Sequence, residues 1–312
     1  MSHATRLLFA YLGVTLIWAT TPLAIQWGTL DTSFDFAAMS RMVIGMCCAL
    51  LLIGLMRVPL PRHRRALASY TVAGLGQFLA MYGVYWAAQR IDSGLMSVIF
   101  GLSPLVTSLM ASLWLGEKLL NLPRLLGMLL GLVGLGVIFG DGALLLEPGM
   151  LPGITVLLLG VLLHAASLVG LKYIADDSPP LATTTGALLV ATPLFLLAWW
   201  LGGGTWPATY SWRGGLSILY LGVFGSVLGF ALYYFIVRHM ASERVALILV
   251  ITPIAALFVG WQFNDEALPA TAWIGGALIS GGLLLHVRGS RAGRLEGRGR
   301  GLSKPPLARP HS

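Results

Sequence analysis

Charge is scarce in this chain of 312 residues, and that scarcity excludes a soluble globular fold. Asp, Glu, Lys and Arg make up 10% of the residues, apolar residues make up 57%, and the mean hydropathy is +0.82. A typical soluble domain carries about 25% charged residues. A water-soluble fold of this length could not bury so much apolar surface, so the composition indicates an integral membrane protein.

Cysteines and catalytic motifs are also scarce. The two cysteines, Cys47 and Cys48, are adjacent in an apolar run, which suits small packing residues rather than a disulfide or a thiolate metal site. The sequence contains no HExxH or GxSxG motif and no Cys/His cluster with metal-ligand spacing. We therefore expect no cofactor and no metal, and we predict that the chain is not an enzyme.

Long apolar stretches, in contrast, are abundant. A membrane-spanning helix needs about 20 mostly apolar residues. Ten stretches meet this need: 7–28, 36–56, 68–88, 93–115, 124–140, 152–175, 181–201, 214–237, 242–262 and 271–287. Backbone groups in lipid must be satisfied internally, and the period-two alternation of a membrane barrel is absent. The predicted fold is therefore an all-α integral membrane protein with ten transmembrane helices.

Lys and Arg residues gather on one side of this predicted topology. If the N-terminus is cytoplasmic, the inner segments hold 17 of them, the outer loops hold only Arg90 and Arg213, and Arg41 lies within a span. The positive-inside rule then places both termini in the cytoplasm. The basic tail, 288–312, lacks apolar periodicity and is expected to be disordered. We expect it to act as a topology determinant or as a contact for anionic membrane lipids, rather than to bind nucleic acid.

One sequence pattern occurs twice. "SPLVTSLMASLWLGEK" spans residues 103–118 and contains Pro104 and Glu117. "TPIAALFVGWQFNDEA" spans residues 252–267 and contains Pro253 and Glu266, an offset of 253 − 104 = 149 residues. The chain therefore divides into two repeats, 1–150 and 151–287, with five spans each. Because five is odd, the second repeat must be inverted in the membrane relative to the first. Inverted repeats are typical of transporters that bind substrate near the midplane, between the repeats.

The order of these motifs resembles the drug/metabolite transporter superfamily in its ten-helix form with two tandem EamA domains. The resemblance is carried by "LIWATTPLAIQWG", "FAAMSRMVIG", "SPLVTSLMASLWLGEKL" followed by "GMLLGLVGLGVIF", and "TPIAALFVGWQFNDEAL" followed by "IGGALISGGLLL". It implies a carrier of small metabolites in the bacterial cytoplasmic (inner) membrane, often an exporter. The second copy has "NDE" where the first has "GE", which is a departure within the repeat.

The repeated prolines and glutamates each allow two interpretations. Pro104 and Pro253 are near the midplane and can act as a matched pair of hinges, or they can simply shape helix packing. Glu117 and Glu266 are at span ends. We expect these carboxylates to bond the N-terminus of a following helix rather than to bind substrate.

Polar and aromatic side chains at membrane depth provide the candidate substrate site, because such groups are costly in lipid and often functional. The candidates are Trp18, Thr21, Arg41, Gln77, Tyr82, Tyr85, Trp86, His164 and Ser167. Several have structural alternatives. Tyr85 and Trp86 can belong to an interfacial aromatic belt. Arg41 can either extend outward to water or hold a substrate carboxylate or phosphate, and His164 can simply bond a neighbouring helix.

The sequence thus predicts an alternating-access transporter, expected to export a small organic metabolite such as an amino acid. A non-transport membrane protein such as a lipid scramblase is the alternative. No Asp or Glu lies deep in a span, so a proton-linked mechanism would depend on His164, while facilitated diffusion or exchange stays equally open. The expected partners are the small-molecule substrate and membrane lipids, with no nucleic acid, and the chain is a monomer or a homodimer.

Overall fold

The structure is a computed structural model, and it describes residues 3–116, 122–140, 149–209, 211–240 and 242–302. Within these residues the chain is helical and forms no strand. The elements of the first repeat are α1 His3–Gly28, α2 Phe34–Met56, α3 Arg64–Ala87, α4 Ser93–Phe100, α5 Ser103–Leu115 and α6 Leu122–Phe139. Those of the second are α7 Met150–Ile174, α8 Pro180–Leu201, α9 Trp212–Tyr220, the π-helix η2 Leu221–Leu228, α10 Gly229–His239, α11 Ser242–Asn264 and α12 Ala270–Leu302.

The helices confirm the predicted all-α membrane fold. Nine stretches of the described residues are long and apolar enough to cross a membrane. The helix outside this set is α3, which begins with Arg64 and Arg65 and carries Gln77 and several tyrosines along its length. Together with α3, these stretches give ten rods that match the ten predicted spans. The cytoplasmic placement of the two termini stays a prediction.

Two of the ten rods are interrupted where the sequence predicted uniform spans. The fourth divides into α4 and α5 at Gly101 and Leu102, directly before Pro104. The eighth contains η2 between α9 and α10. A π-helical segment rotates the residues that follow it relative to an uninterrupted α-helix, and such segments are frequent at functional sites.

The predicted disordered tail is corrected for its first part. The last helix, α12, continues from the predicted end of the tenth span to Leu302. Extending an existing helix adds one hydrogen bond per residue without a new nucleation step, and this favours continuation even through a segment rich in Arg and Gly. Residues 303–312 lie outside the described residues.

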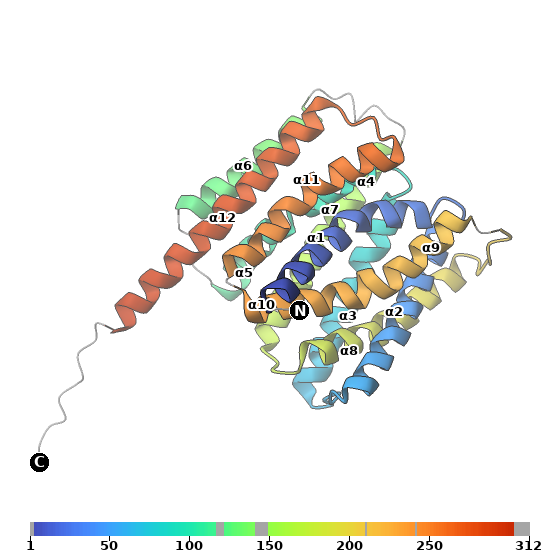
Figure 1. The fold of residues 1–312 in the computed structure, drawn as a ribbon, viewed down its shortest axis with the longest axis horizontal. Helices are drawn as coiled ribbons and strands as arrows, with labels where there is room; N and C mark the ends of the chain where they lie inside the picture. The colour runs from blue at the N-terminus through green and yellow to red at the C-terminus, as the bar shows by residue number, and fades with distance from the viewer. Residues whose placement is uncertain (1–2, 117–121, 141–148, 210, 241, 303–312) are drawn as a thin grey trace, which may run out of the picture.

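Helices far apart in the sequence pack side by side, as α6 and α12 do in Figure 1, and the contacts relate the repeats by an approximate two-fold exchange. The third rod of the first repeat, α3, packs against α7, the first helix of the second repeat; reciprocally, α9, η2 and α10 pack against α1. Helices in equivalent positions also pair with each other, as α2 does with α8, α4 with α11 and α6 with α12. Successive rods run in opposite directions, so the equivalent helices of the two repeats lie antiparallel to each other where the repeats meet.

Close helix contacts along this seam depend on small residues. Gly76 of α3 faces Ser167 of α7, and a Cβ at Gly76 would overlap the serine side chain. Gly127 of α6 faces the carbonyl oxygen of Gly282 of α12 in the same way. Small residues allow membrane helices to approach closely, so that the backbones of the two helices pack against each other. The large leucines Leu113 and Leu132, in contrast, are 72% and 63% exposed, as expected on a lipid-facing surface.

Candidate functional site

Arg41 lies in the interior of the bundle, at the seam between the repeats. The side chain comes from α2 and is only 6% exposed, so it does not extend to water as the alternative interpretation allowed. Its Nε donates a hydrogen bond to Ser226 Oγ of η2 (3.2 Å). Its Nη1 is buried and has no hydrogen-bond partner among the described residues.

The π-helix explains how Ser226 reaches this position. Ser226 Oγ donates to the carbonyl oxygen of Leu221, five residues earlier (3.1 Å), so its lone pairs are free to accept from Arg41. Gly225, the preceding residue, leaves space at the guanidinium, because a Cβ there would lie 3.4 Å from Arg41 Nη2. No sequence pattern predicted η2, since apolar composition does not distinguish an α-helix from a π-helix.

Tyr85 and Gln77 of α3 lie on the same side of the seam. Tyr85 is fully buried, and its hydroxyl lies close enough to the Arg41 guanidinium for a side-chain interaction, although no hydrogen bond of ordinary geometry forms among the described residues. The aromatic-belt interpretation is therefore wrong for Tyr85, because a belt residue would face the membrane interface. Gln77 Nε2 contacts Met42 Sδ at 3.5 Å, directly beside Arg41.

Trp18 and Thr21 of α1 lie elsewhere along the seam. The Trp18 ring packs against Tyr233 of α10, with ring centroids 5.0 Å apart. The indole also lies against the junction of η2 and α10, because a Cβ at Gly229 would be 3.5 Å from Trp18 Nε1. Thr21 Oγ1 donates to the carbonyl oxygen of Ile17 in its own helix (2.6 Å). A substrate role for either residue stays a prediction.

His164 of α7 faces the break in the fourth rod. Its ring lies 5.5 Å from that of Phe100, the last residue of α4. Among the described residues, no hydrogen bond or ion pair of this imidazole is found, so the alternative in which His164 bonds a neighbouring helix has no support. Its role in substrate binding or proton transfer stays a prediction.

The other three candidates make contacts of a structural kind. Tyr82 belongs to an aromatic cluster with Phe34, Phe78 and Phe195, with centroid distances of 5.2, 5.6 and 6.4 Å. Trp86 carries the Arg90 guanidinium 3.6 Å above its ring centroid, near the end of α3. Ser167 Oγ donates to the carbonyl oxygen of Val72 (3.0 Å) and joins α7 to α3.

Both prolines lie near the break in the fourth rod, but only Pro104 is at an interruption of its own helix. Pro104 follows the break between α4 and α5, whereas Pro253 lies inside the continuous helix α11. Pro253 packs beside the break, because a Cβ at Gly101 would lie 3.0 Å from its Cγ. The repeat offset places Val250 of α11 at the position equivalent to Gly101, so the second copy lacks the glycine that accompanies the break.

Glu266 bonds a helix N-terminus, as expected, but the helix is α4 of the other repeat rather than the following helix, α12. Its carboxylate accepts from Ser93 Oγ (2.6 Å), Ser93 N (3.0 Å) and Gly94 N (3.1 Å) and is 5% exposed. These bonds satisfy N–H groups that a helix start leaves unpaired. The expectation for Glu117 falls outside the described residues.

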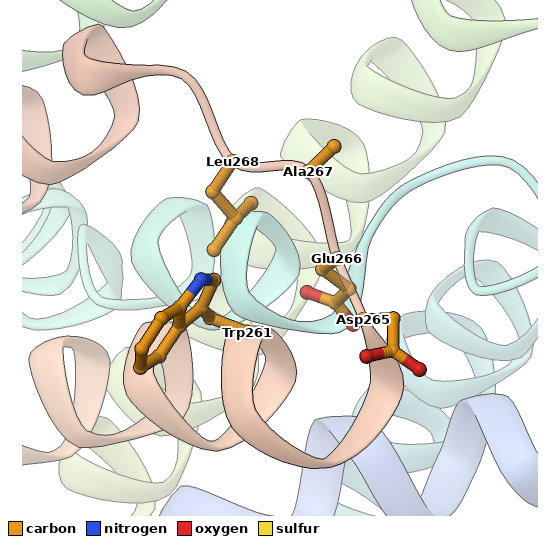
Figure 2. A pocket seen from close by; sticks show the side chains of 5 residues that line it. All are labelled: Trp261, Asp265, Glu266, Ala267 and Leu268. Atoms are coloured by element: carbon orange, nitrogen blue, oxygen red, sulfur yellow. The ribbon is translucent and has the colours of Figure 1, made fainter.

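A shallow pocket of about 290 Å³ lies beside this carboxylate. Figure 2 shows Trp261 and Leu268 on one side of it and Glu266 and Asp265 on the other. The pocket lies at the end of α11, far along the helix from Pro253, and contains none of the sequence-predicted site residues. It is a surface hollow next to the inter-repeat contact rather than the predicted midplane site.

Sequence reasoning missed three residues that extend the Glu266 contact. Asn264 Nδ2 donates to Glu266 Oε1 (3.2 Å) and to Gln26 Oε1 of α1 (2.9 Å), while Trp27 Nε1 donates to Asn264 Oδ1 (2.8 Å). The polar ends of α1, α4 and α11 are thus connected across the seam. The departure "NDE" in the second copy was the available signal, because it placed an amide two residues before the carboxylate.

A second inter-repeat contact lies at the opposite end of the rods, where α2 ends, α3 begins and α7 ends (Figure 1). His63 Nε2 of the first repeat lies 3.6 Å from Asp176 Oδ1 of the second. His63 Nδ1 accepts from the backbone N–H of Ala66 at the start of α3 (3.2 Å). The histidine side chain is 57% exposed and the aspartate side chain 4%, so water reaches this contact from the histidine side.

Comparison with known families accounts for nearly the whole chain. The sequence model described as "EamA-like transporter family" matches residues 5–140 and 151–288. The chain is similar to the uncharacterized transporter YoaV of Bacillus subtilis, with 23% identity over 282 residues that cover 90% of this chain and 96% of the relative. It is also similar to the uncharacterized inner membrane transporter YedA of Escherichia coli, with 24% identity and 85% coverage of both chains.

Two further similarities bear on substrate and fold. A protein of Streptantibioticus cattleyicolor named as a probable terminal-alkyne amino-acid exporter is 24% identical over 296 residues, covering 91% of this chain and 94% of the relative. One solved crystal structure of a protein superposes with a TM-score of 0.64 at 20% sequence identity and covers 95% of this chain and 100% of that one. At this identity the likeness shows the fold alone.

Proposed function

Because the chain belongs to the EamA-like transporter family, we propose that it exports a small organic metabolite, such as an amino acid, by alternating access. It is a multi-pass protein of the bacterial inner membrane and a transporter rather than an enzyme. The substrate is bound between the repeats, near the midplane. The two halves open in turn, so that the site faces one side of the membrane at a time.

The observation that carries this proposal is the presence of polar contacts between the repeats at both ends of the rods. At one end, Glu266 and Asn264 of the second repeat bond Ser93 and Gln26 of the first. At the other end, His63 of the first repeat pairs with Asp176 of the second. A carrier must break the contact at one end while keeping the other, and side-chain contacts of modest net strength suit repeated breaking.

The proposed substrate class is supported by side chains at the seam. Arg41 offers a positive charge in the interior, and the paired rings of Trp18 and Tyr233 offer an apolar surface. An amino acid presents both a carboxylate and, in many cases, an apolar part. The similarity to a relative named as an amino-acid exporter favours the same class.

The test is transport by the purified full chain reconstituted in liposomes. Radiolabelled amino acids, sugars and organic polyanions are each offered with and without a pH gradient, and fluorescent lipid movement between leaflets is followed in parallel. We expect saturable, stereoselective flux of one or more amino acids without lipid scrambling. Equal flux of sugars or polyanions would contradict the substrate class. Lipid movement without solute flux would instead favour a scramblase.

Variants at the two deep seam residues locate the path of that flux. Replacing Trp18 by Ala removes the indole that packs on Tyr233, and replacing His164 by Ala removes the imidazole beside Phe100. We expect each variant to lower the flux by at least tenfold if the substrate passes between the repeats, because misplaced binding groups have effects of this size. Flux at the unmodified rate in both variants would contradict a site at these residues.

A further inference from the structure

The charge of Arg41 is not neutralised within the described part of the chain. No acidic side chain lies within ion-pair distance of Arg41 among those residues, and the contact between His63 and Asp176 is at the far end of the rods. Asp35, the acidic residue on the same helix as Arg41, accepts instead from the backbone N–H of Phe36 (2.8 Å). A guanidinium keeps its proton in proteins, so the charge has to be balanced by a partner group.

An unpaired buried charge is costly, and a chain that retains one in its membrane interior usually uses it. Ser226 offsets part of the cost, since it accepts from Nε. Among the described residues, Nη1 of Arg41 and the hydroxyl of Tyr85 have no hydrogen bond of ordinary geometry. The guanidinium is still close enough to the Tyr85 hydroxyl to interact with its oxygen, which leaves the hydroxyl hydrogen free to donate to another group. Both side chains are more than nine-tenths buried and lie within electrostatic range of each other.

The chemistry of these unsatisfied atoms defines the missing partner. Nη1 can only donate a hydrogen bond, and the Tyr85 hydroxyl can donate one as well. The partner must therefore accept two hydrogen bonds and carry negative charge. A planar carboxylate meets both requirements with its two oxygens, and guanidinium–carboxylate pairs are among the stronger hydrogen-bonded pairs. A phosphate would bring more charge and more acceptor oxygens than this single cation and single hydroxyl can satisfy.

The position of the site connects it to the movement of the repeats. Arg41 and Tyr85 come from α2 and α3 of the first repeat, whereas Ser226 comes from η2 of the second. The site is closed in this structure, because both unsatisfied atoms are inaccessible to water. A carboxylate can reach Arg41 only when α2 and η2 separate, and it would then take the place of Ser226 on the guanidinium.

We propose that Arg41 and Tyr85 bind the carboxylate of the transported substrate, and that Ser226 occupies the guanidinium when the substrate is absent. This inference rests on the proposed transport function and narrows its substrate to compounds with a free carboxylate. The apolar remainder of such a substrate extends along the seam. Neutral sugars and amines lacking a carboxylate are poor substrates for this carrier.

The first arm of the test uses the unmodified protein, so it does not depend on the folding of any variant. Each common amino acid is compared with its own carboxamide and its decarboxylated amine in proteoliposome counterflow. We expect the amino acid that is carried best to lose about 100-fold or more in flux when its carboxylate is replaced, because a site built for a charged group rejects analogues that leave it unpaired. Equal flux of acid and carboxamide would overturn the proposal.

The second arm uses variants of the site. We expect Arg41→Gln to carry the acid no better than the carboxamide. Arg41→Lys keeps the charge but loses the planar fork, and we expect about a tenfold loss in flux. Tyr85→Phe removes one hydroxyl and is expected to cause a smaller, severalfold loss. Arg90→Gln is the matched control, because Arg90 is already partnered by Trp86 at the end of α3, and its flux should be unchanged.

A third arm separates failure of this inference from failure of the proposed function. Purified full chain in detergent is heated with millimolar sodium benzoate or with benzamide, which share a ring and differ in the carboxylate. We expect benzoate, but not benzamide, to raise the unfolding temperature of the unmodified protein, and to have no effect on Arg41→Gln. If no solute is carried but this pattern holds, the carboxylate site stands and the transport function fails. Equal stabilisation of both proteins by benzoate, or none, would overturn the site.

Discussion

At the scale of single residues, the side chains that join the repeats do so through bonds the sequence only partly indicates. The repeat predicted that Glu266 ends its span and bonds a helix start, and this is confirmed. It did not indicate that the helix would be α4 of the other repeat, because a repeat places equivalent residues but does not say which neighbours they meet. The repeat likewise did not predict that Arg41 is buried, because its burial depends on contacts with η2.

Removal of the Glu266 carboxylate tests its structural role. Replacing Glu266 by Ala leaves the Ser93 N–H, the Ser93 hydroxyl and the Gly94 N–H without their acceptor. We expect the free energy of unfolding to fall by about 2–4 kcal/mol, as for a lost helix cap with buried donors left unsatisfied. Thermal unfolding in detergent measures the change. Asp265→Asn, an exposed neighbour, is the control and should unfold like the unmodified protein.

Ser167 allows a sharper distinction between a binding and a packing role. Its hydroxyl donates to the Val72 carbonyl oxygen and lies against Gly76, so its hydrogen bond is already used within the protein. We expect Ser167→Ala to lower the free energy of unfolding by roughly 0.5–1.5 kcal/mol while leaving the KM for transport unchanged. Titration of flux against substrate concentration provides the check. A severalfold rise in KM at unchanged stability would instead indicate that Ser167 contacts the substrate.

At the scale of helices, the sequence predicted where the rods lie but not where they break. Ten apolar stretches gave ten rods because a membrane allows few alternatives to a helix of about 20 residues. The interruption at Gly101 depends on a glycine beside a proline, and the one at η2 depends on a local change of hydrogen-bond register. Neither changes the apolar composition from which the spans were predicted.

Pro104 provides a test of the break between α4 and α5. Replacing Pro104 by Ala restores the backbone N–H that a continuous helix needs, so we expect the fourth rod to straighten and the protein to gain stability. If the break is a hinge, the transport rate should fall about tenfold or more, because a hinge must absorb the backbone change during opening. Initial rates in proteoliposomes measure this effect.

The control for that experiment is another helix proline, one without a counterpart in the first repeat. Pro193 lies inside α8, and the repeat offset places Ile44 at the equivalent position. We expect Pro193→Ala to leave the transport rate within about twofold of the unmodified protein, since nothing in the repeat marks it as a moving point. Equal losses in both variants would indicate that prolines in this bundle only shape packing.

At the scale of the whole molecule, the order of contacts between helices follows the repeat that is visible in the sequence. Exchanging the repeats reproduces the packing of α3 on α7 as that of α9, η2 and α10 on α1. The sequence could predict this relationship because two copies with an odd number of spans must be inverted. It could not predict that inter-repeat contacts would be present at both ends, since those depend on side chains in connections that differ between the copies.

The predicted orientation in the membrane has a direct test. With Cys47 and Cys48 replaced by Ala, single cysteines are introduced at Arg62 and Thr209, which are exposed at opposite ends of the rods. The positive-inside rule predicts that a membrane-impermeant maleimide labels Thr209→Cys in intact cells and Arg62→Cys only after lysis. The reverse pattern would place both termini outside the cytoplasm.

The most direct measurement links the two repeats at one end and follows transport. Gln26 of α1 and Asn264 of α11 are hydrogen-bonded across the seam, and each is replaced by Cys in the protein lacking Cys47 and Cys48. A short reducible crosslinker is then applied in proteoliposomes. Alternating access predicts that flux stops when the crosslink forms and returns when it is reduced. The crosslinker should not change the flux of either single-cysteine variant. Undiminished flux with the crosslink in place would contradict movement of the repeats against each other.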